Sequence, residues 1–104
     1  MNGFQINFYT LQDREYQHQS IADWLVEQAR SLKIRGNTVI HGAESYGRDG
    51  RLHSARFFEQ AEQPIIVIMV VSGTEADAIL NLVKQAGIKM FYTKAPVEFG
   101  VMGD

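Results

Sequence analysis

The sequence predicts an α+β fold in which two helices cover one face of a single sheet. Three observations predict it: apolar residues that alternate near the N-terminus, two segments with helical apolar spacing, and a continuous apolar run between those segments. Taken along the chain, the segments follow the order β-α-β-loop-β-α-β.

The first two elements are a strand and a helix. Apolar and more polar residues alternate from residue 4 to residue 9, which is the period of a half-buried strand. Apolar residues then recur at three- and four-residue spacing from 21 to 32, as on one side of a helix. Ser20 followed by Asp23 is typical of an N-terminal cap, and we expect this helix to end near Gly36.

A second strand, a long loop and a third strand follow. Residues 38–43 begin with β-branched side chains and are predicted as the second strand. The loop runs from about 44 to 63 and is rich in glycine and arginine. Pro64 then opens the longest apolar run of the chain, residues 65–71, whose lack of alternation indicates a strand that is central or covered on both faces.

A second helix and a divided tail complete the chain. Residues 72–74 break the apolar run and begin a helix that we expect Gly87 to close. Two short strand-like pieces, 90–93 and 97–101, are separated by Pro96, which argues against an uninterrupted central strand. We therefore expect the tail to fold onto an edge of the sheet.

This order is the ferredoxin-like split βαβ arrangement, βαββαβ, with a long loop between the second and third strands. Both helices would cover the same face of the sheet. The third strand is apolar at every position, so its outward side chains also need cover. Oligomerisation through the sheet would supply it.

Composition restricts the classes of protein. A chain of 104 residues suits one domain, residues 1–104. With 45% hydrophobic and 21% charged residues and no long apolar run, no membrane insertion is expected, and the N-terminus lacks the features of a signal peptide. Zero cysteines fit a cytoplasmic location and exclude thiolate sites. A net charge of -2, without a basic block, argues against nucleic-acid binding.

The loop carries the candidate binding chemistry. Arg48, Arg51 and Arg56, with His53 among them, offer paired donors that match phosphate or carboxylate oxygens. The alternative is that they are solvated charges, partly paired with acidic residues of the same region. These acids are Glu44, Asp49 and Glu59.

Other motifs in the loop are weaker. Gly42, Gly47 and Gly50 would permit positive φ or close approach of the backbone to a ligand, although turn formation alone explains Gly50. The residues after Gly47 do not complete a phosphate-binding P-loop, and Ser45 lacks the glycine context of a hydrolase nucleophile. The three histidines show no recognised ligand spacing. We therefore expect neither a catalytic residue nor a metal site.

Together these residues resemble a known family. The likeness covers most of the chain and rests on GNTVIHG at 36–42, on the RLHSAR stretch, and on the proline, apolar strand and helix that follow. The single positions that carry it are Glu44, Gly47, Arg51, His53 and Arg56. The pattern resembles the DUF190 (UPF0166) proteins, small relatives of the PII-like signalling proteins. Ser45 stands where that pattern commonly has glycine.

The resemblance implies a homotrimer with its sheets facing inward that binds a ligand rather than catalysing a reaction. The implied ligand is an adenine nucleotide or another small anion, held between subunits at the base of the loop. The implied ligand residues are Gly42, Glu44, Gly47, Arg48, Arg51, His53 and Arg56. The loop tip, with Tyr46, Asp49 and Gly50, would contact a partner such as a membrane transporter or channel. Nitrogen-regulatory PII proteins add a glycine- and lysine-rich phosphate loop where this chain has only residues 86–89.

Two other functions stay open from the sequence. One is an enzyme that processes phosphate esters at the same cleft, with His53 as general acid or base. The other is a structural or adaptor trimer that resembles the CutA proteins in fold and takes no small ligand.

Overall fold

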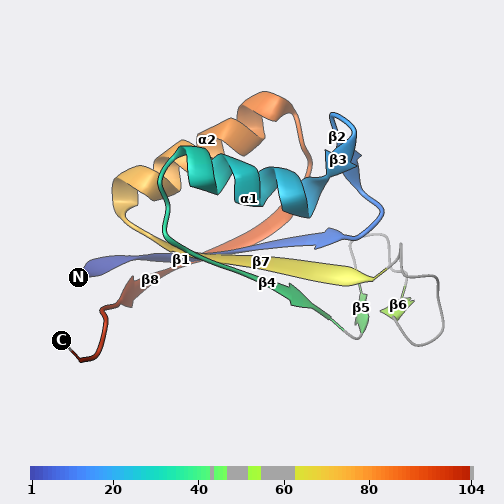
Figure 1. Cartoon of the computed structure of the whole chain (residues 1–104). Coiled ribbons are helices and arrows are strands. Elements are labelled where there is room, and N and C mark those ends of the chain that lie inside the picture. Colours follow the sequence, from blue (N-terminus) through green and yellow to red (C-terminus); the bar gives the residue numbers. More distant parts are fainter. Residues whose placement is uncertain (43, 47–51, 55–62, 104) are drawn as a thin grey trace.

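The fold is a four-stranded antiparallel sheet with two helices on one of its faces (Figure 1). The computed structural model describes residues 1–42, 44–46, 52–54 and 63–103. The strands of the sheet are β1 (Asn2–Leu11), β4 (Gly36–His41), β7 (Pro64–Val71) and β8 (Phe91–Glu98), and the helices are α1 (Ile21–Ser31) and α2 (Gly73–Ala86). Their order across the sheet, β4-β7-β1-β8, confirms the predicted ferredoxin-like arrangement.

One face of the sheet and the apolar sides of both helices enclose the core. Ile6 and Phe8 of β1 lie there beside Val67 and Met69 of β7, and all are buried. Although β7 is apolar throughout, its burial alternates, because it lies between β1 and β4 and only one of its faces meets the helices. This confirms its predicted central position.

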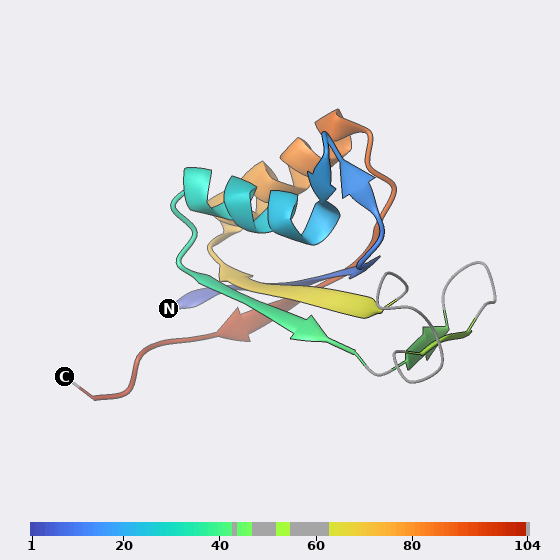
Figure 2. The same cartoon turned by 45° about the vertical axis from the view of Figure 1, so that its right-hand side comes forward.

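The other face of the sheet is called the open face here. It carries Gln5, Asn7 and Tyr9 of β1, which alternate with the buried residues of the same strand. Among the described residues, no helix lies on this side of the sheet (Figure 2). The alternate residues of β7, such as Ile68 opposite Asn7, are only half-buried there.

Helix α1 begins at the predicted cap but ends earlier than predicted. The Ser20 hydroxyl accepts a hydrogen bond from the Asp23 N–H at 3.1 Å. The expected end near Gly36 was wrong, because Lys33 adopts a left-handed φ of 61°. The Ile34 N–H then bonds back to the last turn at 2.9 Å, which closes the helix as a Schellman motif does.

Helix α2 has both predicted ends. The Ser72 hydroxyl accepts from the Glu75 N–H at 3.1 Å, and the Ser72 N–H donates to the Glu75 carboxylate at 2.9 Å. This reciprocal pair is a capping box. Gly87 closes the helix with a φ of 72°. Neither α2 nor any other described helix is long and apolar enough to cross a membrane.

The last strand differs from the prediction of two separate pieces. β8 is continuous from Phe91 to Glu98 and pairs with β1 through Pro96, which lies opposite Phe4. Because β8 is an edge strand, it needs ladder donors on one side only and tolerates a proline that cannot donate. The predicted edge position was correct, whereas the predicted break was wrong.

The connection between β1 and α1 contains a ribbon that the sequence did not predict. Strands β2 (Glu15–Tyr16) and β3 (Gln19–Ser20) pair across a turn whose two central residues both have positive φ, 52° and 68°. Positive φ at both positions is the geometry of a tight hairpin turn. The ring of Tyr16 packs edge-on against that of Trp24 with centroids 5.1 Å apart, which ties the ribbon to α1.

Candidate functional site

The predicted binding loop leaves and re-enters the sheet at one end, between β4 and β7. β4 begins at Gly36, two residues before its predicted start, and His41 is its last residue. The Gly42 N–H donates to the Pro64 carbonyl at 2.8 Å, which extends the ladder between the two strands. Nδ1 of His41 lies 3.3 Å from Oε1 of Gln63, so side chains from the two stems also meet. The base of the loop is thus held by backbone and side-chain contacts.

Gly42 does not require the left-handed conformation that favours glycine, since its φ is not positive. A Cβ at this position would lie 3.4 Å from the Cβ of Pro64, an ordinary contact. The turn geometry therefore does not explain the glycine. Its predicted role, to let a ligand approach the backbone, stays a prediction.

Within the long loop, the structure describes a short hairpin that the sequence did not predict. It consists of β5 (Glu44–Tyr46) and β6 (Leu52–Ser54), paired antiparallel with Ser45 opposite His53. Three of the predicted site residues, Glu44, Tyr46 and His53, therefore lie on this hairpin. The other predicted residues, Gly47, Arg48, Asp49, Gly50, Arg51 and Arg56, lie outside the described residues.

The connection between α2 and β8 lies at the same end of the sheet as the loop stems. β8 begins with Phe91 opposite Tyr9, and β7 begins with Pro64 opposite Leu11 of the same strand. The connection therefore brings Lys89 to this end of the molecule, a position that the sequence alone did not reveal.

A groove of about 540 Å³ separates α2 from the first half of β8. Its apolar lining includes Phe8, Leu80, Val83, Ile88, Met90 and Tyr92. Asp77, Asn81, Lys84 and Lys89 supply its polar groups. Because α2 does not cover β8, Tyr92 is 47% exposed in this groove even though its ring lies 6.3 Å from that of the buried Phe8. The apolar spacing in this region predicted a helix and a strand, but it did not predict that a groove would separate the two in the fold.

Comparison with known proteins identifies the family. The model of the family DUF190, described as "Uncharacterized ACR", matches residues 3–99. The chain belongs to the DUF190 family. The resemblance found in its sequence is thereby confirmed.

Solved structures show that this DUF190 chain has the PII-like fold. A PII-like signaling protein from Thermus thermophilus superposes with a TM-score of 0.69 at 17% identity, over 92% of this chain and 87% of that one. CPII, a nitrogen regulatory PII-like protein from Thiomonas intermedia K12, superposes with a TM-score of 0.73 at 9% identity, over 97% and 91%. The latter structure is described as bound to ADP, AMP and bicarbonate.

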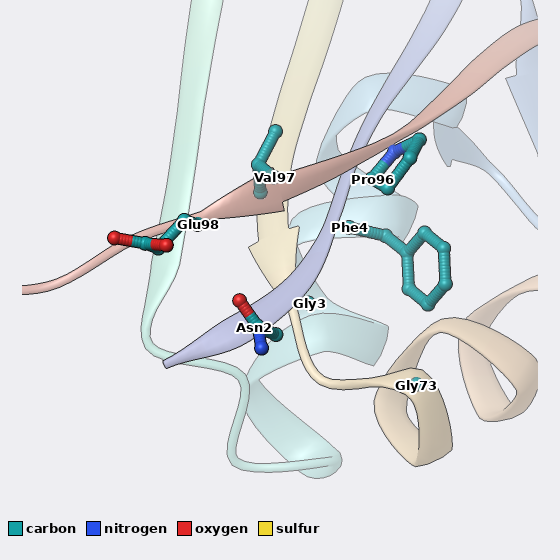
Figure 3. A pocket seen from close by; sticks show the side chains of 7 residues that line it. All are labelled: Asn2, Gly3, Phe4, Gly73, Pro96, Val97 and Glu98. Carbon is teal, nitrogen blue, oxygen red and sulfur yellow. The ribbon is translucent and has the colours of Figure 1, made fainter.

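A second pocket of the DUF190 chain lies at the opposite end of the sheet, away from the loop. It has a volume of about 430 Å³ and is formed by the start of β1, the first residue of α2 and the end of β8. Figure 3 shows Phe4 and Pro96 beside each other on neighbouring strands, with Gly73 across from them. Its one ionisable lining side chain is Glu98, an acid, so this pocket is poorly suited to an anion.

Metal binding finds no support in the described residues. Across residues 1–42, 44–46, 52–54 and 63–103 there is no group of three or more histidine, aspartate or glutamate side chains placed to hold an ion. The loop end of the sheet, where the two loop stems and the connection that carries Lys89 lie, is the stronger candidate site for an anion.

Proposed function

We propose that this chain is a PII-like regulatory subunit that binds a small anionic effector, such as an adenine nucleotide, at the base of the β4–β7 loop. The family match over residues 3–99, joined with the PII-like fold, is the observation that carries the proposal. A neighbour of that fold binds ADP, AMP and bicarbonate, all small anions. The loop of this chain carries the arginines that such a ligand needs.

The proposed ligand site joins two segments that meet at one end of the sheet. The loop would supply Arg48, Arg51 and Arg56, with His53, Glu44 and the two glycines 42 and 47 beside the ligand. The α2–β8 connection would add the ammonium group of Lys89. This connection lacks a glycine-rich phosphate loop, so the loop arginines would neutralise most of the negative charge of the ligand.

The proposal includes a homotrimer in which the open faces of three sheets pack together. The open face supports this, because its residues on β7 are isoleucine and valine, and Phe91 and Ile40 are 55% and 43% exposed. Exposed apolar surface of this extent favours an interface. The loop bases would then lie beside the seams between subunits.

Occupancy of the site would be reported through the loop. Ligand contacts with arginines and backbone amides would offset the entropy lost when a long loop adopts one conformation. The tip, with Tyr46, Asp49 and Gly50, would then present a surface to a partner such as a membrane transporter or channel.

The test is calorimetric titration of the protein with AMP, ADP, ATP, bicarbonate and phosphate. We expect at least one of them to bind, and Arg51→Ala and Arg56→Ala each to weaken that binding by about tenfold or more, since an arginine–phosphate pair is a charge-assisted contact. Arg35→Ala is the matched control, because this exposed arginine lies at the far end of β4.

Three outcomes would contradict the proposal. One is the absence of binding by every anion tested. Another is unchanged affinity in both loop variants. A third is conversion of a nucleotide or phosphoester to product in a reaction that requires His53, which would favour an enzyme instead.

A further inference from the structure

The open face carries no charged side chain on any of the four described strands of the sheet, although charges lie close by on the other face. β8 shows the division most clearly, because its sequence alternates between the two faces. Its residues on the open face are Phe91, Thr93, Ala95 and Val97. Lys94 points to the helix side, where its Nζ lies 4.3 Å from the centroid of the Phe4 ring. Exclusion of charge from one face of an exposed edge strand indicates that this face becomes buried.

A row of polar groups nevertheless crosses the middle of the open face. The Gln5 side-chain amide donates to Oδ1 of Asn7 at 3.2 Å, and the Asn7 amide donates to the Tyr9 hydroxyl at 3.4 Å. All three side chains are half-buried. These three residues are called the polar ladder. It lies between β7, which presents Ile66, Ile68 and Val70, and the edge strand β8.

The polar ladder has hydrogen-bonding capacity left over. Each amide has two N–H donors and a carbonyl oxygen, and the hydroxyl of Tyr9 accepts from Asn7 with its own proton free to donate. Within the described part of the chain, the ladder makes no side-chain hydrogen bonds beyond these two. If the open face is buried, the remaining donors and acceptors must find partners, because an unpaired buried polar group is costly.

We propose that the polar ladder packs against the polar ladders of other copies of this chain, at the symmetry axis of the assembly. There the spare amide donors of one copy meet the spare carbonyl and hydroxyl groups of the next. The inference rests on the self-association that forms part of the proposed function and names the residues at its centre. It assigns them a role: the ladders fix the register and the number of copies.

A second copy suits this face better than a protein of another kind. An uncharged row with both donors and acceptors is complementary to itself, and its symmetry-related partner brings the same groups. The apolar residues of β7 favour burial of the face, but hydrophobic contact does not specify the orientation of the copies. An entirely apolar face would therefore permit assemblies with different numbers of copies. A single buried polar position is the best-attested device that restricts such an interface to one arrangement.

The first test compares Asn7→Leu with wild type by native mass spectrometry and light scattering. We expect wild type to form one oligomer, and Asn7→Leu to remain associated but to distribute over two or more stoichiometries. Thr93→Val is the matched control, because Thr93 lies opposite Asn7 on the same face but outside the ladder. This variant should keep the wild-type stoichiometry.

The second test uses the absence of cysteine from the chain. Asn7→Cys introduces one thiol, so any disulfide formed by mild oxidation must join two copies. We expect a cross-linked dimer band at least fivefold stronger for Asn7→Cys than for Ala95→Cys, which lies on the same face but outside the ladder, opposite Gln5 on the edge strand β8. If Asn7→Leu does not fold, the cross-linking of Asn7→Cys still tests whether the ladders of two copies meet.

The outcomes separate this inference from the proposed ligand. A monomeric wild type, an Asn7→Leu protein with the single stoichiometry of wild type, or stronger cross-linking from Ala95→Cys would each overturn the inference. Titration of AMP into wild type is interpreted separately. An intact oligomer that binds none of the tested anions contradicts the ligand proposal and leaves the polar ladder in place.

Discussion

Gly3 of β1 lies directly against the carbonyl oxygen of Val71, at the point where β7 ends and α2 begins. A Cβ on Gly3 would overlap that oxygen and would also come within 2.8 Å of the Phe99 ring. Glycine is required here by space and not by a positive φ. The start of β1 is held close to the residues after β8 at this point. The Met1 and Phe99 backbones exchange two hydrogen bonds there, at 2.8 and 2.9 Å.

Gly3→Ala is therefore expected to lower the free energy of unfolding by about 2 kcal/mol, because backbone atoms must move to admit the methyl group. Urea denaturation measures it. Gly73→Ala is the control, since a Cβ there would meet its nearest neighbour at 3.7 Å, in ordinary contact. Equal stability of the two variants would show that the strands separate freely at this end.

Thr10 of β1 is 7% exposed, and its hydroxyl oxygen has no hydrogen-bond partner in the described structure. Thr10→Val replaces the hydroxyl by a methyl group of similar shape and removes this unpaired polar atom. We expect the free energy of unfolding to rise by about 1 kcal/mol, and the Tm by about 4–8 °C for a domain of this size. Thr10→Ser keeps the hydroxyl, loses the methyl group and should lower the Tm. A lower Tm for Thr10→Val would indicate that the hydroxyl is satisfied.

Lys33 and Gly87 occupy the same kind of position, the left-handed residue that ends a helix, with φ values of 61° and 72°. Only glycine adopts this conformation without steric cost. Lys33→Gly should therefore stabilise the protein and Gly87→Ala should destabilise it, each by about 1 kcal/mol. Thermal unfolding of the two variants checks the opposite signs. Shifts in the same direction would mean that contacts other than backbone conformation decide the effect.

Tyr16 connects the β2–β3 ribbon to α1 through the ring of Trp24, which is 5% exposed. Tyr16→Ala removes this edge-on contact, with an expected cost of about 1–3 kcal/mol in unfolding free energy. Trp24 is the only tryptophan of the chain, so its fluorescence reports the change directly. We expect a red-shifted emission in Tyr16→Ala and not in Tyr16→Phe, which keeps the ring. An unchanged emission spectrum in Tyr16→Ala would show that contacts other than Tyr16–Trp24 hold the ribbon against α1.

Where a structural feature is decided by neighbours in the chain, the sequence predicted it well. Ser20 was identified as a cap, residues 72–74 as the start of a helix and Gly87 as a helix end, because each is decided by backbone groups within a few residues. The ferredoxin-like order followed from the spacing of apolar residues. The motif-based family resemblance was confirmed for the same reason, since motifs are local.

Features that depend on a residue's distant surroundings were missed. Pro96 was expected to interrupt a strand, but its cost depends on whether β8 has one neighbour or two, and its own segment does not contain that information. The β2–β3 ribbon depends in the same way on a contact with Trp24. The end of α1 was placed too late for a different, local reason: the left-handed Lys33 that follows the helix has no sequence signal comparable to glycine.

The candidate site divides along the same line. By itself the sequence determined which loop carries the arginines, which fold presents it and which family it belongs to, because composition and local order suffice for these. Only the tertiary structure decided that Lys89 lies at the end of the sheet from which the loop departs, and that the face with Gln5, Asn7 and Tyr9 is uncharged across all four strands. Strand pairing determines both, because it joins residues that are far apart along the chain.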